Sequence, residues 1–535
     1  MYSVTGSHSC WVAACLVCLL AANSKGEILD VPEEYTAIQE ALSATATGDT
    51  VRVAPGRYHE FLTCSTDGLV LLGQHSSDTL PELWTILDPI PGEIDTPSTL
   101  VLTGDSATVQ NLVLFNRLEL RQPEWATRTG GILFSGETLN IMNCRFDSVS
   151  VAVEGGNDVN VKNSVFIGCQ WQCIRPASFG SLTADSCFFD GEGNWLVRCY
   201  SSSSIRNCTF LCSATHNDLL SFAGENIEVI GCRFGPCYSA FPVLRATTMG
   251  NCRIEGCVFE DIERASALIE VSMDCRTDEG VPVTIRGNRF QNYQGIPPAN
   301  GTNAISLICQ GFEHGYFGLI EDNIFEDGFS ISAPGVNISG SVDIVHNSFT
   351  NLQPDSLADV KASQRDFDTI RARDNQFYEP GIAAISGGAY FDASENWWGD
   401  STGPFHPSLN PDGLGTEVGN GVIFEPWLTV HPDSADSNSS SIEQPVLLPN
   451  EYSLSAYPNP FNATTTLSIQ VSRPGVYDLI LYDVTGRETA KLFNGRIVAA
   501  HDVQINADKF ATGIYFARLV GEERELAVVK LVLLK

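Results

Sequence analysis

Basic residues are scarce in this chain of 535 residues, which has 31 lysines and arginines, 64 aspartates and glutamates, and a formal net charge of −33. Residues 451–535 contain nine acidic and nine basic residues, so the whole negative excess belongs to the first 450 residues. An acidic surface repels phosphate backbones. The composition therefore excludes nucleic acid as a partner, although such a surface also serves simply to keep a protein in solution.

Long hydrophobic runs are also missing. The apolar stretch Trp11–Ala22 is too short to span a bilayer, and small residues follow it. We expect residues 1–24 to be a signal peptide, although no Lys or Arg precedes Lys25. A lipoprotein signal ending at Cys15 is the alternative. We expect no transmembrane segment in the mature chain.

Cysteine is absent after Cys309, although the chain contains 17 cysteines. Three of them fall in the expected signal peptide: Cys10, Cys15 and Cys18. Cys169 and Cys173 form a tight pair but have no adjacent His, which argues against zinc. Disulfides are compatible with export, and Cys212 and Cys237 are the better candidates because we expect them to face outward. The pairing stays open.

One short pattern recurs eleven times between Cys144 and Trp398: two apolar residues a step apart, then Cys, Ser or Asn, then an aromatic two places on. The polar position holds Cys144, Ser164, Cys187, Cys208, Cys232, Cys257, Asn288, Asn323, Asn347, Asn375 and Asn396. The aromatic position holds Phe146, Phe166, Phe189, Phe210, Phe234, Phe259, Phe290, Phe325, Phe349, Phe377 and Trp398. Successive aromatics lie 20 to 35 residues apart, which is typical of the coils of a solenoid.

The phase of the repeat predicts strands. Apolar and polar residues alternate in Val159–Val161, Ile227–Val229 and Val342–Ile344, and no helical stripe or leucine-rich pattern appears. Stacked coils form parallel sheets in which equivalent side chains lie roughly 4.8 Å apart. We therefore expect the Asn side chains to pass hydrogen bonds from coil to coil and the Phe column to stack inside.

Both ends of the repeat region resemble a known family. Tyr35–Leu42 has helical apolar spacing and would cap the open end of the solenoid. Val31–Glu60 as a whole is similar to the opening of right-handed parallel β-helix proteins of the pectin-lyase-like superfamily, and Asn396–Leu428 resembles the closing turn of bacterial members. The resemblance covers roughly residues 27–430. It implies an all-β chain with a right-handed parallel β-helix of about twelve coils at residues 25–430.

The composition changes after this region. Residues 431–450 are rich in Ser, Asp, Pro and Asn, which predicts a linker. Residues 451–535 contain short alternating strands between Gly and Pro turns, which predicts a small β-sandwich. Its phrases Tyr457–Asn462, Tyr482–Arg487, Gly513–Tyr515 and Lys530–Lys535 resemble the C-terminal sorting domain of type IX secretion. This resemblance implies a bacterial protein that the type IX secretion machinery exports and that is secreted or held on the outer cell surface.

Catalytic residues are hard to find. The Asp-Asp and Gly-His-Gly runs of hydrolytic members of the resembled superfamily do not occur here. The long loop near residue 276 offers the best alternative, since Asp274, Asp278 and Glu279 are candidate Ca²⁺ ligands and Arg276 is the candidate base of a lyase. The same residues also fit a solvated charged loop. No other cofactor is indicated.

Acidic residues recur directly after Phe259 and Phe325, where Asp261 and Asp327 are examples. Their recurrence at the same place in the repeat indicates an exposed turn more than a catalytic centre.

Aromatic residues outside the inward positions of the repeat are expected to be exposed, and they suggest binding because sugars dock on aromatic rings through their apolar faces. These residues are Trp125, Trp171, Trp195, Tyr200, Tyr293 and Tyr316. Three functions from different classes follow: an exported protein that engages polysaccharide, a polysaccharide lyase or glycoside hydrolase, and a structural or adhesive rod of roughly 60 Å. The acidic surface favours neutral glycans, or anionic ones bridged by Ca²⁺.

Overall fold

The computed structural model spans the chain and divides into two compact units, residues 1–432 and 433–535. In the first unit the structure describes residues 26–74, 84–89, 98–115, 130–191, 195–215, 218–239, 241–263, 265–273, 283–294, 303–309, 316–330, 336–339, 341–354, 358–362, 369–378, 382–385 and 390–432. In the second it describes residues 453–457, 461–462, 464–470, 475–483, 487–497, 500–506, 510–511, 513–521 and 524–533.

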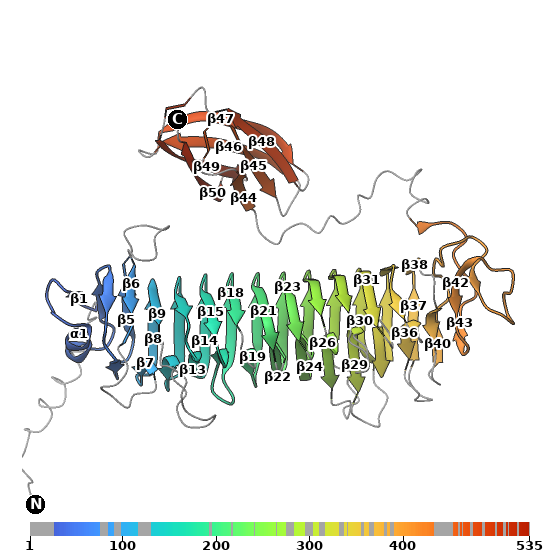
Figure 1. Ribbon diagram of the computed structural model, residues 1–535, viewed down its shortest axis with the longest axis horizontal. Coiled ribbons are helices and arrows are strands. Elements are labelled where there is room, and N and C mark those ends of the chain that lie inside the picture. The colour runs from blue at the N-terminus through green and yellow to red at the C-terminus, as the bar shows by residue number, and fades with distance from the viewer. Residues whose placement is uncertain are drawn as a thin grey trace, which may run out of the picture. The chain divides into compact units, whose positions relative to one another are not determined.

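The first unit is a parallel β-helix, in which coil after coil stacks along one axis (Figure 1). Each coil contributes strands to three parallel ladders. The first and second ladders form one 29-stranded sheet because the long strands β22 (Leu220–Ile230) and β24 (Leu244–Glu255) belong to both. The third ladder is a separate 14-stranded sheet.

The first ladder consists of β22, β24 and β4 (Leu62–Cys64), β7 (Ser98–Leu102), β10 (Gly130–Phe134), β13 (Val151–Gly155), β16 (Gln172–Arg175), β19 (Trp195–Cys199), β26 (Ala267–Met273), β29 (Asn303–Cys309), β32 (Val336–Ser339), β36 (Ala358–Ala362), β39 (Ile382–Ile385), β41 (Pro404–Phe405) and β42 (Gly415–Val418).

The second ladder consists of β22, β24 and β1 (Ile28–Val31), β2 (Thr50–Val53), β5 (Leu69–Gly73), β8 (Ser106–Gln110), β11 (Thr138–Met142), β14 (Asp158–Lys162), β17 (Ser181–Asp185), β20 (Ser203–Arg206), β27 (Val283–Arg286), β30 (Tyr316–Glu321), β33 (Ser341–Val345), β37 (Thr369–Arg373), β40 (Tyr390–Asp392) and β43 (Val422–Ile423).

The third ladder consists of β3 (Gly56–Tyr58), β6 (Thr85–Leu87), β9 (Leu112–Phe115), β12 (Arg145–Asp147), β15 (Val165–Cys169), β18 (Phe188–Gly191), β21 (Thr209–Thr215), β23 (Arg233–Ser239), β25 (Val258–Glu263), β28 (Arg289–Gln294), β31 (Ile324–Ser330), β34 (Ser348–Thr350), β35 (Gln353–Pro354) and β38 (Gln376–Tyr378).

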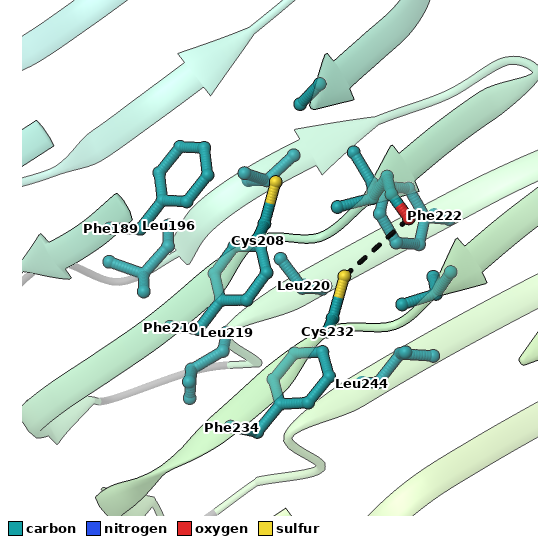
Figure 2. Packing of buried hydrophobic residues seen from close by; sticks show 14 of the residues in the cluster. Phe189, Leu196, Cys208, Phe210, Leu219, Leu220, Phe222, Cys232, Phe234 and Leu244 are labelled. Atoms are coloured by element: carbon teal, nitrogen blue, oxygen red, sulfur yellow. Dashed lines mark hydrogen bonds between the residues drawn. The ribbon is translucent and has the colours of Figure 1, made fainter. Parts of the chain in front are cut away.

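The aromatic residues of the repeat form one continuous stack inside the coils, as predicted. Neighbouring rings from Phe146 to Trp398 are 4.5 to 5.1 Å apart between centroids and within 16° of parallel. Figure 2 shows three of them, Phe189, Phe210 and Phe234, with Cys208 and Cys232 beside the column. These buried rings contribute much of the apolar area that holds successive coils together.

The polar residues of the repeat are buried beside this stack. The repeat cysteines Cys187, Cys208, Cys232 and Cys257 are at most 3% exposed, and the hydrogen bond with Cys208, together with burial, raises the pKa of the Cys187 thiol far above its usual value. The later coils use Asn, and the Asn347 amide donates to Asn375 Oδ1 and accepts from the Asn323 amide, at 3.0 and 2.9 Å. The predicted ladder of amide hydrogen bonds is confirmed.

The residue before each buried polar residue makes the turn between the second and third ladders. At this turn the chain uses glycine or a residue in the left-handed region, including Asn143, Asn163, Asn207 and His346 with φ of 50–56°. Asn and Gly adopt this conformation at low cost. A second residue in the left-handed region, Asp261, follows the aromatic residue Phe259. Asp261 is exposed, as expected, but it lies within β25 and not in a connecting turn.

Helix α1 (Ile38–Ala44) covers the N-terminal end of the first unit and buries Ile38, Ala41 and Leu42. It begins three residues later than the apolar spacing predicts. The Glu60 carboxylate accepts hydrogen bonds from the first backbone N–H groups of the helix, those of Ile38 and Gln39, at 3.0 and 2.9 Å. This interaction satisfies donors that a helix leaves without partners.

The second unit is a β-sandwich with its own apolar core, which includes Leu467, Leu479 and Leu519. Its three-stranded antiparallel sheet contains β44 (Ser453–Tyr457), β45 (Thr464–Gln470) and β48 (Ala500–Asn506). Its four-stranded antiparallel sheet contains β46 (Gly475–Asp483), β47 (Glu488–Ile497), β49 (Gly513–Gly521) and β50 (Arg524–Leu533).

Candidate functional site

The predicted Ca²⁺ and lyase residues lie outside the described residues. The segment between β26 and β27, residues 274–282, is not described, and it contains Asp274, Arg276, Asp278 and Glu279. The Ca²⁺ site and the lyase base therefore stay predictions.

The aromatic candidates divide into different groups. Tyr293 is 1% exposed and packs in the core, so the expectation of an exposed Tyr293 was wrong.

Among the cysteines, Cys237 is buried, so the expectation that it faces outward was also wrong. Trp125, the side chain of Tyr316 and the side chain of Cys212 lie outside the part of the chain that is described. Trp171, Trp195 and Tyr200 remain as a group.

These three aromatic residues lie on two successive coils of the first ladder. Trp171 precedes β16, Trp195 opens β19, and Tyr200 follows β19. The Trp171 and Trp195 rings meet edge to face at 6.4 Å between centroids. Trp171 is 36% exposed and Tyr200 is 41% exposed, so ring surface remains accessible to a ligand.

Arg198 contacts two of these aromatic rings. Its guanidinium carbon lies 4.4 Å from the Trp195 ring centroid and 4.8 Å from the Tyr200 ring centroid. Such cation–π contacts fix the rings and the arginine at an exposed site. The buried Arg198 Nε has no hydrogen-bond partner among the described residues.

A row of charged residues runs beside the rings because the strands are parallel and in register. Arg198 pairs with Ser221, Ser221 with Arg245, and Arg245 with Glu270, on four successive coils. Arg245 Nε lies 3.0 Å from Glu270 Oε1. This distance makes an ion pair, but the N–H is not aligned for a hydrogen bond.

Asp218 lies at the centre of this surface. Val197 pairs with Leu220, so Asp218 lies one coil after Trp195 at the same level. Its side chain is 5% exposed, its Oδ2 is 3.5 Å from Arg245 Nη1, and its Oδ1 has no hydrogen-bond partner within the described parts of the chain. Burial raises the pKa of the Asp218 carboxyl to about 6, and the charge of Arg245 opposes that rise.

One further buried group faces the same region. Gln172 pairs with Trp195 in the ladder and is 1% exposed, and its Oε1 lacks a partner among the residues described. Buried polar atoms without partners are rare in proteins, and each requires an explanation. These atoms have almost no accessible surface, so a ligand on this surface would meet the exposed rings of Trp171 and Tyr200 rather than the buried atoms.

We call this surface the Trp195 patch. It consists of Trp171, Gln172, Trp195, Arg198, Tyr200, Asp218, Arg245 and Glu270. The sequence indicated the aromatic residues of the patch but not Gln172, Arg198, Asp218, Arg245 and Glu270. These five look like ordinary surface residues in the sequence, and only the register between coils shows that they meet.

The second unit matches a known family. Residues 455–534 match the secretion system C-terminal sorting domain. The predicted sorting domain is therefore confirmed, and type IX secretion makes this a secreted or cell-surface protein. Among the described residues, no helix is long and apolar enough to cross a membrane.

Solved structures similar to the whole chain include two double mutants of the tailspike protein of E. coli bacteriophage HK620. The first is 10% identical, with a TM-score of 0.33, and the match covers 90% of this chain and 86% of that chain. The second, solved in complex with a pentasaccharide, is 11% identical, with a TM-score of 0.32 and coverage of 89% and 84%. A comparison with curated proteins found no match.

Proposed function

We propose that this exported protein binds polysaccharide, that the β-helix of residues 25–430 carries the binding surface, and that the Trp195 patch is the site. In this proposal residues 1–24 are the signal peptide, residues 431–450 link the two parts, and residues 451–535 serve export. One observation carries the proposal. The accessible rings of Trp171 and Tyr200 lie on two successive coils, and the Arg198 guanidinium packs against the rings of Trp195 and Tyr200.

The charges of the patch favour a neutral glycan. Arg198 and Arg245 are balanced by Asp218 and Glu270, so the patch lacks the positive excess that attracts uronates. Sugar hydroxyls both donate and accept hydrogen bonds, and they would pair with the partly exposed Arg245 guanidinium and Glu270 carboxylate. The rings would hold the apolar face of the sugar.

The test is binding of the purified full chain to a panel of neutral and uronic polysaccharides, with and without Ca²⁺. Tyr200→Ala and Trp171→Ala should each weaken binding about tenfold, which is the effect of losing one stacking contact of about 1.4 kcal/mol. Tyr390→Ala is the matched control, because Tyr390 is 54% exposed on a distant coil of the same β-helix. Equal losses in all three variants would contradict the proposed site, and retention of no glycan at all would favour the structural rod.

A polysaccharide hydrolase is the second candidate, and the state of Asp218 favours it. Asp218 keeps its proton to about pH 6 and shares Arg245 with Glu270. A protonated carboxyl near a carboxylate is the pairing used in glycosidic bond cleavage. Asp218→Asn should abolish the release of reducing ends while binding remains, and activity should fall above pH 6. A lyase that needs Ca²⁺ and Arg276 would instead lose unsaturated product with chelator and in Arg276→Ala.

A further inference from the structure

A second cluster of chemically active side chains lies on the second ladder, on coils that do not contribute to the Trp195 patch. Glu321, Asp322 and His346 form the one group of three His, Cys, Asp or Glu residues in the described chain whose ligand atoms all lie within 4.8 Å of one another. His346 Nδ1 is 3.8 Å from Asp322 Oδ1. The cluster therefore combines an imidazole with two carboxylates from neighbouring coils.

The backbone fixes this arrangement before any ligand binds. Asp322 and His346 occupy the left-handed turn on successive coils, with φ of 56° for each. Asp322 N donates to Val345 O at 3.2 Å, and His346 N donates to Arg373 O at 3.3 Å. The turn holds both Cα atoms in register. Metal binding would therefore lose less conformational entropy than it would if the fold did not already place the side chains together.

The distance between His346 and Asp322 suits a shared metal ion better than a direct hydrogen bond between the two side chains. At 3.8 Å the imidazole and the Asp322 carboxylate are too far apart for a hydrogen bond. Two ligand atoms bound to one Zn²⁺ at about 2.1 Å each lie roughly 3.4 Å apart in a tetrahedron and roughly 4.2 Å apart across a line. The observed 3.8 Å is slightly wider than the tetrahedral value, so the two side chains would move closer together on binding Zn²⁺.

The side chains around the cluster carry a net negative charge, which favours binding of a cation. Arg286 contacts both acids of the cluster, with Nε 3.4 Å from Glu321 Oε2 and Nη2 3.2 Å from Asp322 Oδ2. Asp374 Oδ2 lies 3.8 Å from His346 Nε2 on the other side of the imidazole. The Arg286 guanidinium thus contacts both carboxylates of the cluster, and a dication would compete with it for them.

We propose that Glu321, Asp322 and His346 form a binding site for Zn²⁺ that joins two neighbouring coils. The mixed imidazole and carboxylate ligands suit a borderline transition metal, whereas Ca²⁺ takes oxygen ligands alone. Three protein ligands leave a fourth position for water. This site is independent of the proposed glycan binding and distinct from the Ca²⁺ ligands predicted at residues 274–279.

The test is calorimetric titration of the metal-free full chain with Zn²⁺, with Co²⁺ absorption as a readout of imidazole ligation. His346→Asn should weaken Zn²⁺ binding at least about tenfold. It should leave the melting temperature of the metal-free chain unchanged, because the chain itself uses Asn at this turn at Asn143, Asn163 and Asn207. Arg286→Ala should strengthen Zn²⁺ binding by removing the competing guanidinium.

A pair of matched variants separates ligation from general attraction to an acidic surface. Asp322→Asn should weaken binding much more than Asp374→Asn, although both remove one charge beside the same imidazole. Equal effects of the two variants, an unchanged affinity in His346→Asn, or the absence of one tight Zn²⁺ per chain would each overturn the proposal.

Discussion

At the scale of single residues, burial changes the chemistry of Asp218. The carboxyl lies below the surface of the Trp195 patch, and the charge of Arg245 only partly compensates for lost hydration. An ordinary aspartate has a pKa near about 3.9, so a folded-state value of about 6 means that the native protein holds this proton more tightly than the unfolded chain. Stability and proton binding are therefore linked at this residue.

The sign of this linkage gives a prediction. Between about pH 4 and pH 6 the native state binds more protons than the unfolded state, so the free energy of unfolding should fall as pH rises through this window. Above pH 6 the ionised Asp218 should cost about 2–3 kcal/mol. Asp218→Asn should therefore be more stable than wild type at pH 7 and similar near pH 4. Chemical denaturation at several pH values measures this, and a variant with the pH profile of wild type would contradict it.

At the scale of the structural element, one coil depends on a few repeated positions. A left-handed residue makes the turn, a buried Cys, Ser or Asn follows it, and a stacked aromatic fills the interior. In the Asn coils the side chain replaces backbone partners that the turn removes. Asn347 Nδ2 donates to Ile320 O, Val345 O and Asn375 Oδ1, at 2.9, 3.0 and 3.0 Å.

Asn347→Ala should therefore be strongly destabilising. Asn347 Oδ1 also accepts from the Asn323 backbone N–H at 2.9 Å, so the variant leaves buried donors and acceptors without partners. The expected loss is about 3 kcal/mol or more. Asn160→Ala is the control, because Asn160 is only partly buried and donates to Asn140 Oδ1 alone, at 3.2 Å. Similar losses for the two variants, measured by denaturation, would show that the buried amide ladder adds little.

At the scale of the whole molecule, the chain divides into two units with separate cores. The core of the first unit is continuous from Leu29 to Phe424, and that of the second contains residues from Phe461 to Leu533. Because the two cores share no residue, folding of the β-helix does not require the sorting domain.

Deletion of the sorting domain should therefore change location and not folding. A chain that ends at residue 450 should accumulate in the periplasm instead of reaching the cell surface or the medium, because residues 455–534 match the sorting domain. Its β-helix should keep the melting temperature of the full chain. Cell fractionation with immunoblotting measures the location, and surface delivery of the truncated chain would contradict the role of the domain.

The sequence by itself determined the features that repeat locally. Alternation of apolar and polar residues predicts strands, and the recurring polar and aromatic positions predict the buried columns, because both depend on neighbours within one coil. The sorting domain could also be predicted from the sequence, because its motifs follow one another in order along the chain.

Only the tertiary structure decided which outward residues meet. The repeated aromatic residues of successive coils are separated by 20 to 35 residues because the loops differ in length. The sequence therefore does not show which surface positions of neighbouring coils lie side by side. Arg245 therefore reaches both Asp218 and Glu270, and Asp322 reaches His346, through register alone. Tyr293 was misplaced for a local reason, because Asn292 with φ of 52° breaks the alternation of β28 and turns Tyr293 inward. Side chains that share a site on a parallel β-helix come from different coils, and the hydrogen bonds between coils set their positions.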